Sequence, residues 1–318
     1  MIMKTDAAIA VEALTKSYKN NRVLKGVDFA VRRGRVFALL GSNGAGKTTT
    51  IRILSTLILP DGGRAEIMGH DVVREARSVQ RKISLTGQYA AVDEMLTGRE
   101  NLHLIGSLRR LKNVRALADE LLVALDLAQA ADQRVSAYSG GMRRKIDLAA
   151  GIIGNPPVLF LDEPTTGLDP QSRLSLWKTI QSLSRSGTTI FLSTQYLEEA
   201  ERLADDIAIL DKGVIVAHGS VAELKKTLPS GCIEFSFEDR SHLQRADAAL
   251  RAFKRRTNDE AMTLAVTADD SIEQLAAVLN LLKAEGIPVS RFEQKLPTLE
   301  DVFLTHIDHD REQVARHG

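Results

Sequence analysis

A glycine-rich segment directly follows an apolar run early in the chain. The run VFALLG ends at residue 41, and GSNGAGKT, residues 41–48, fits the pattern G-x-x-x-x-G-K-[ST] between a predicted strand and a predicted helix. Glycines let successive backbone N–H groups turn toward a phosphate, and the N-terminus of the helix adds positive potential. In such a loop Lys47 reaches the β/γ-phosphates and the Thr48 hydroxyl holds Mg²⁺. The residues expected to line this nucleotide site are Gly41, Ser42, Asn43, Gly44, Ala45, Gly46, Lys47, Thr48 and Thr49.

Short apolar runs alternate with helical patterns up to about residue 220, which predicts an α/β fold. The expected strands, buried on both faces, are residues 36–41, 158–162, 189–194 and 207–210. Asp169 and Pro170 predict the start of a helix that ends at Gly187. The apolar face of that helix is expected to carry Leu174, Trp177, Ile180 and Leu183.

Two adjacent acids follow the apolar strand VLFL, in the segment VLFLDEP. Carboxylates at the end of a buried strand are costly unless they engage a cation or water. Asp162 is suited to positioning Mg²⁺, and Glu163 is suited to orienting the water that attacks the γ-phosphate. The pair therefore predicts a hydrolytic site.

The segment YSGGM, residues 138–142, introduces the helical pattern MRRKIDLAAGII. A hydroxyl and bare N–H groups at a helix N-terminus form an anion site without a lysine. The expected phosphate-facing residues are Ser139, Gly140 and Gly141. Taken with GSNGAGKTT and VLFLDEPTTGLDP, this segment makes the chain resemble the nucleotide-binding subunits of ABC transporters, over about residues 8–220.

The resemblance implies an α/β P-loop NTPase core with an N-terminal antiparallel β portion and a helical subdomain at about residues 88–155. We expect the nucleotide-binding domain to span residues 1–225. Residues 226–310 have a strand and helix pattern that predicts a small α/β accessory domain, for which a ferredoxin-like arrangement is one candidate. Residues 311–318 are interpreted as a tail.

The resemblance also assigns roles to single residues. Tyr18 matches the family's adenine-stacking aromatic residue. Gln88 matches the glutamine that contacts Mg²⁺ and links the core to the helical subdomain. Asp169 matches the loop that crosses between two subunits.

Gln195 occupies a position where most of the family places histidine, at the end of TIFLST. Its amide can donate a hydrogen bond to the γ-phosphate, but it cannot take up a charge or relay a proton. The segment YSGGM, which stands at the family's signature sequence, also differs from the commoner LSGGQ, at Tyr138 and Met142. The expected catalytic residues are thus Lys47, Glu163 and Gln195. With YSGGM and the C-terminal PTLEDVFLTHI, this substitution is similar to the daunorubicin-resistance type of drug-efflux ATPase.

That type implies hydrolysis of ATP with Mg²⁺ between two head-to-tail copies of the chain. It also implies a separately encoded transmembrane permease of the ABC-2 type, a peripheral location at the cytoplasmic face of the membrane, and export of a drug-like or other hydrophobic compound. The longest apolar runs of the chain are shorter than the roughly 20 residues that span a bilayer, so we expect any membrane role to come through a partner.

Two alternatives remain open at this point. The first is a soluble ABC-type ATPase that acts on ribosomes or DNA; however, 42 Lys and Arg residues balance 41 Asp and Glu residues, so charge gives no argument for nucleic acid. The second is an exporter subunit with a degenerate, regulatory ATPase, which Gln195 and Met142 would motivate.

The single cysteine, Cys232, excludes an internal disulfide.

Overall fold

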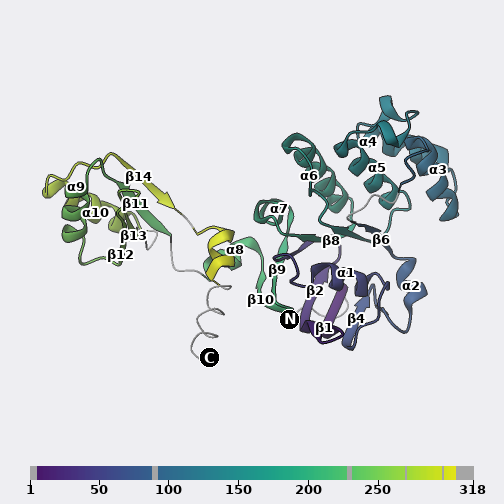
Figure 1. Cartoon of the computed structure of the whole chain (residues 1–318), viewed down its shortest axis with the longest axis horizontal. Coiled ribbons are helices and arrows are strands. Elements are labelled where there is room, and N and C mark those ends of the chain that lie inside the picture. The colour runs from purple at the N-terminus through teal and green to yellow at the C-terminus, as the bar shows by residue number, and fades with distance from the viewer. Residues whose placement is uncertain (1–5, 88–91, 228–230, 269–270, 296, 306–318) are drawn as a thin grey trace. The chain divides into compact units, whose positions relative to one another are not determined.

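The computed structural model describes residues 6–87, 92–227, 231–268, 271–295 and 297–305. The chain divides into two compact units, Met1–Val221 and Ala222–Gly318, and each is considered by itself (Figure 1).

A six-stranded sheet forms the centre of the first unit, with the order β10-β9-β3-β8-β7-β6. All neighbouring pairs are parallel except the edge pair β9–β10. The strands predicted at 36–41, 158–162, 189–194 and 207–210 are confirmed, and β3, β7 and β8 are buried at every residue. The bounds are β3 Val36–Leu40, β6 Ile83–Thr86, β7 Val158–Asp162, β8 Thr189–Thr194, β9 Asp206–Asp211 and β10 Val214–Gly219.

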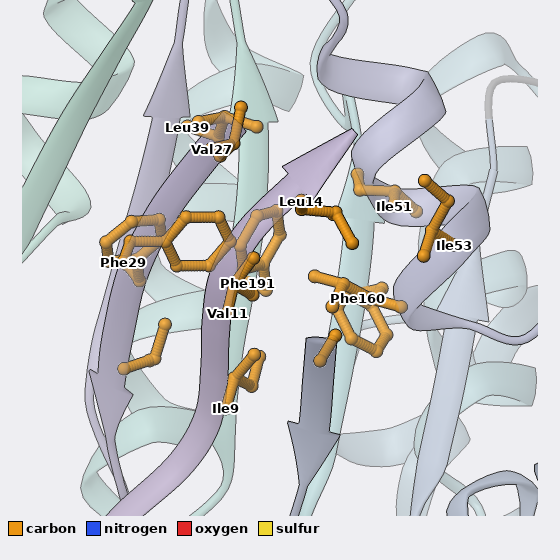
Figure 2. Close-up of a cluster of buried hydrophobic side chains, with 14 of the residues drawn as sticks. Ile9, Val11, Leu14, Val27, Phe29, Leu39, Ile51, Ile53, Phe160 and Phe191 are labelled. Carbon is orange, nitrogen blue, oxygen red and sulfur yellow. The ribbon is translucent and has the colours of Figure 1, made fainter. Parts of the chain in front are cut away.

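The predicted N-terminal antiparallel portion is a second sheet, with the order β2-β1-β4-β5. Its strands are β1 Ala7–Tyr18, β2 Asn21–Arg32, β4 Gly62–Ile67 and β5 His70–Asp71. Apolar side chains from this sheet, from the six-stranded sheet and from α1 (Lys47–Leu54) form one core (Figure 2). The ring centroids of Phe37 and Phe191 lie 5.0 and 5.7 Å from that of Phe29, and Phe160 lies 5.5 Å from Phe191. Because Ile51 belongs to this core, it fixes the helix that begins at Lys47.

The predicted helical subdomain contains α3, α4 and α5, and it has a core of its own. A capping box formed by Thr97 and Glu100 is present at the start of α3. The bounds are α3 Gly98–Leu108, α4 Val114–Ala124, η1 Ala128–Ala130, η2 Val135–Ala137 and α5 Gly140–Ile152. The other helices of the first unit are α2 Ala76–Gln80, α6 Pro170–Arg185 and α7 Leu197–Leu203.

The apolar face predicted for α6 is partly wrong. Trp177 and Ile180 are buried as expected, but Leu174 is 40% exposed and Leu176 is buried in its place. The buried face of α6 therefore consists of Leu176, Trp177 and Ile180, and Leu183 is half-buried. The N-cap at Asp169 and the proline at the first helical position are confirmed.

The second unit contains one strand that the sequence pattern missed. The sequence pattern of residues 242–256 predicts a continuous helix. In the structure, α9 ends at Ala249 and β12 (Arg255–Asn258) follows. With β12 the element order is β-α-β-β-α-β, the ferredoxin-like pattern, in an antiparallel sheet ordered β12-β13-β11-β14. The other bounds are α8 Val221–Lys226, β11 Cys232–Ser236, α9 Arg240–Ala249, β13 Thr263–Thr267, α10 Ile272–Ala284 and β14 Arg291–Lys295, and residues 299–305 are helical.

Candidate nucleotide site

Three neighbouring parallel strands bring the predicted site residues to one edge of the sheet. Strand β8 lies between β3 and β7 (Figure 1). The glycine-rich loop lies at the carboxyl end of β3, the acidic pair at that of β7, and the segment with Gln195 at that of β8. The N–H of Gly41 donates to the carbonyl of Thr194 at 3.2 Å, and the N–H of Glu163 donates to the carbonyl of Ser193 at 3.1 Å. The glycine-rich loop, the acidic pair and the segment that holds Gln195 therefore adjoin one another.

The glycine-rich loop has the shape that its sequence predicts. Gly46 caps α1 with φ of 116°, a conformation that favours glycine, and a Cβ at this position would approach Leu24 to 2.7 Å. Lys47 is 4% exposed, and its ammonium donates to the carbonyls of Gly41 and Ser42 at 2.8 and 3.1 Å. The loop thus holds a buried cation beside a helix N-terminus, which suits a bound phosphate group.

The acidic pair lies against the loop. The Thr48 hydroxyl donates to the Asp162 carboxylate at 3.3 Å, and the Ser193 hydroxyl donates to the same carboxylate oxygen. A carboxylate oxygen of Glu163 lies 3.4 Å from the Lys47 ammonium, with side-chain exposures of 9% and 5%. The four side chains expected to act on a triphosphate, Lys47, Thr48, Asp162 and Glu163, are thus adjacent.

The donor set fits Mg²⁺. The Thr48 hydroxyl and the Asp162 carboxylate offer the oxygen ligands that Mg²⁺ takes alongside substrate phosphates. Across the described ranges, no group of three or more His, Cys, Asp and Glu side chains could hold a metal ion. A site with one carboxylate that shares the ion with phosphates is consistent with both observations.

Glu163 has a backbone conformation that few non-glycine residues adopt. Its φ is 49°, in the left-handed region, and such a conformation costs on the order of 1–3 kcal/mol. It persists only where the surrounding structure holds it. Here the turn directs the carboxylate back toward Lys47 instead of continuing the strand.

Gln195 is half-buried and lies between the end of β8 and the start of α7. The position of α7 is held through the buried carboxylate of Glu199. This carboxylate accepts from the Thr165 hydroxyl at 2.8 Å and from the indole N–H of Trp177 at 3.0 Å. The strand order thus places Gln195 between the glycine-rich loop and the acidic pair, while its contact with a γ-phosphate stays a prediction.

Ser139 and Gly141 lie at the start of α5, beside α6. The Ser139 hydroxyl accepts from the N–H of Met142 at 3.3 Å, and a Cβ at Gly141 would collide with the Ser172 side chain. Ser172 in turn donates through its N–H and its hydroxyl to Asp169, at 2.9 and 2.6 Å. These bonds lower the pKa of the Asp169 carboxyl, and the bond from the Ser172 hydroxyl has the largest effect. Ser139, Gly141 and Asp169 therefore lie on one surface of the unit.

The remaining site predictions concern Tyr18, Gly140 and Gln88, and Tyr138 is one of the two departures from LSGGQ. Tyr138 is buried and its hydroxyl donates to the carbonyl of Ala130 at 2.7 Å, so this residue packs the helical subdomain. Tyr18 ends β1 and is 43% exposed, which leaves its ring accessible for stacking. A Cβ at Gly140 would contact nothing within 4 Å, so the space beside this residue is open. Gln88 lies outside the described residues.

Sequence reasoning missed three residues of this region: Ser193, Glu199 and Arg144. Ser193 bridges β8 to Asp162, and Glu199 fixes α7. Arg144 donates to the carbonyls of Asp162 and Pro164. The position of Ser193 within the apolar run TIFLST was a signal that it has a specific role. Glu199 and Arg144 lie on amphipathic helices, where charged residues are ordinary and give no such signal.

Comparison with known proteins gives the same answer as the geometry. A family model described as ABC transporter matches residues 24–166. The daunorubicin resistance ATP-binding protein DrrA3 of Streptomyces coeruleorubidus is 46% identical over 308 residues, which cover 96% of this chain and 98% of that protein. The chain belongs to the ATP-binding subunits of ABC transporters. It is accordingly an ATPase.

The family resemblance extends over both units. A second family model, described as the C-terminal domain of DrrA1-3-like ATP-binding proteins, matches residues 219–307. The doxorubicin resistance ATP-binding protein DrrA of Mycobacterium tuberculosis is 42% identical, over 94% of this chain and 93% of that protein. A solved ATP-binding subunit of an ABC transporter is 30% identical, covers 69% of this chain and 92% of its own, and superposes with a TM-score of 0.63.

Proposed function

We propose that this ATPase drives export of a drug-like or other hydrophobic compound through a separately encoded membrane subunit of the ABC-2 type. The observation that carries the proposal is the 46% identity, across nearly the whole of both chains, with a daunorubicin resistance ATP-binding protein. The match to the DrrA1-3-like C-terminal domain supports it further, because that domain lies outside the ATP-binding core.

In the proposed reaction, residues of one chain hold and hydrolyse MgATP. The N–H groups of the loop at 41–48 and the Lys47 ammonium bind the phosphates, and the exposed ring of Tyr18 stacks on the adenine. Thr48 and Asp162 would hold Mg²⁺, together with Gln88, and the ion would neutralise charge on the phosphate oxygens. Glu163 orients the attacking water, and Gln195 donates its amide to the γ-phosphate.

The proposed dimer is head to tail. Ser139, Gly140 and Gly141 at the start of α5 cover the γ-phosphate bound by the partner chain, and Asp169 lies at the same interface. Closure on ATP and reopening after hydrolysis would move the helical subdomain, and this movement would be transmitted to the membrane subunit.

The proposed location is the cytoplasmic face of the membrane, where the chain would be held by its membrane subunit. No helix in the described part of the chain has the length and apolarity to cross a bilayer.

The export function can be tested by coexpressing the chain with its membrane subunit in cells loaded with daunorubicin. We expect lower drug retention than in cells that carry the membrane subunit with Glu163→Gln in this chain. Equal retention in the two strains, with a complex confirmed by copurification, would exclude daunorubicin as a substrate. Copurification of the chain with ribosomes instead of a membrane protein would contradict the export proposal.

Gln195→Ala should lower kcat for ATP hydrolysis by about 10- to 100-fold, because a hydrogen bond to a charged group contributes roughly 1.5–3 kcal/mol. Gln195→His should retain activity, since histidine also donates an N–H at this position, but its rate should become pH-dependent near the imidazole pKa. Steady-state phosphate release between pH 5.5 and 8.5 measures both effects. Unchanged kinetics in the alanine variant would show that Gln195 serves only the turn between β8 and α7.

A further inference from the structure

Arg144 lies in the second turn of α5 and reaches out of the helical subdomain to the edge of the six-stranded sheet. Its Nε donates to the carbonyl of Pro164 at 2.7 Å, and its Nη2 donates to the carbonyl of Asp162 at 3.4 Å. Its Nη1 donates to the carbonyl of Gly87 at 2.6 Å. The side chain is only 10% exposed.

A guanidinium buried in this way needs compensation, because removing a charge from water is costly. Burial lowers the pKa of Arg144, while the carboxylates of Asp147, Asp162 and Glu199 act in the opposite direction. Asp147 lies 3.5 Å away on the same helix. The charge is therefore held by buried acids as well as by backbone carbonyls, and the guanidinium has a fixed orientation.

Two of the three carbonyls belong to the residues directly before and after Glu163. Glu163 has the left-handed backbone conformation, which needs restraint from its surroundings. Its N–H is held from the β8 side by the carbonyl and hydroxyl of Ser193, at 3.1 and 3.2 Å. Arg144 restrains the same turn from the α5 side.

We propose that Arg144 is a positioning residue that holds the strained turn at Glu163, and thus its carboxylate, in the geometry needed for hydrolysis. The inference rests on the proposed role of Glu163. Arginine suits this task because its planar fork presents five N–H donors in fixed directions. Lysine would keep the charge but has a single nitrogen, which cannot serve carbonyls at Gly87 and Pro164 from separate positions. The chain leading to residue 88 is held by the same group.

Arg144→Lys should lower kcat by about tenfold and leave the dissociation constant for ATP unchanged. A 1 Å misplacement of a reacting group costs on the order of 100-fold, and the bonds of Ser193 to the Glu163 N–H limit the displacement to less than that. The matched control is Arg143→Lys. Arg143 is the neighbouring residue on the same helix, but its guanidinium donates to Glu94 and to the carbonyl of Ser136, at 3.0 and 2.9 Å, within the helical subdomain. Steady-state ATP hydrolysis, binding of a fluorescent ATP analogue and thermal unfolding would be measured for both variants.

A second measurement separates positioning from a general structural role. In the Glu163→Gln background, Arg144→Lys should cause no further loss of residual turnover, because a residue that acts through Glu163 has no effect once that carboxylate is gone. A further loss there, weaker ATP binding, or an equal fall of kcat in Arg143→Lys would overturn the inference. The inference would also be overturned if Arg144→Lys had unchanged turnover while Glu163→Gln was inactive. An active Glu163→Gln variant would instead contradict the role proposed for Glu163.

Discussion

Glu163→Gln should bind ATP with the affinity of the unmodified chain and hydrolyse it about 10²–10⁴-fold more slowly, the usual contribution of a general base. The amide has nearly the shape of the carboxylate, so the turn at residue 163 is preserved. It carries no charge to orient the attacking water, and it also gives up the ion pair with Lys47 at 3.4 Å. Multiple-turnover phosphate release measures the loss, and binding of a fluorescent ATP analogue measures the affinity.

Glu198→Gln is the matched control for this variant. Glu198 lies in the first turn of α7, three residues after Gln195, and its side chain is exposed, so the same substitution should leave hydrolysis unchanged. Turnover of Glu163→Gln near the rate of the unmodified chain would rule out Glu163 as the residue that orients water. A loss of ATP affinity in place of turnover would mean that this carboxylate serves binding.

Much of the candidate site could be predicted because its parts are local in sequence. The loop at 41–48 combines glycines, a lysine and a following helix within a few residues. Asp162 is the last residue of a fully buried strand, and Glu163 follows it directly. Apolar runs buried on both faces predicted the strands themselves. The site edge follows from these strands, because the carboxyl ends of parallel strands meet on one side of a sheet.

The parts that escaped prediction depend on contacts between distant segments. Arg144 and Pro164 lie in different elements, and nothing in the pattern of α5 distinguishes Arg144 from its neighbour Arg143. Strand β12 was missed because all four of its residues, RRTN, are polar and show no apolar alternation; pairing with β13 makes them a strand. Tertiary pairing thus decided what local preference left open.

Chains that carry Lys47→Ala and chains that carry Ser139→Ala should each be inactive alone and should regain ATP hydrolysis when paired. Each homodimer has both sites damaged, and loss of one preorganised phosphate donor costs on the order of 100-fold or more. In the mixed pair, the intact Lys47 of one chain faces the intact Ser139 of the other, so one complete site forms. Two affinity tags would isolate the mixed pair, and its rate of phosphate release would be compared with those of both homodimers.

The reciprocal pairing distinguishes action between chains from action within one chain. When Lys47→Ala and Ser139→Ala are placed in the same chain and paired with an unmodified partner, the only intact Lys47 faces the altered residue 139. This pair should be inactive if Ser139 serves the partner's nucleotide, and active if it serves its own. Activity here, with none in the first mixed pair, would contradict the head-to-tail dimer. Ser139 caps α5 and packs beside α6 in the described structure, so its geometry within one chain is the same in both pairings, and only the partner's nucleotide differs.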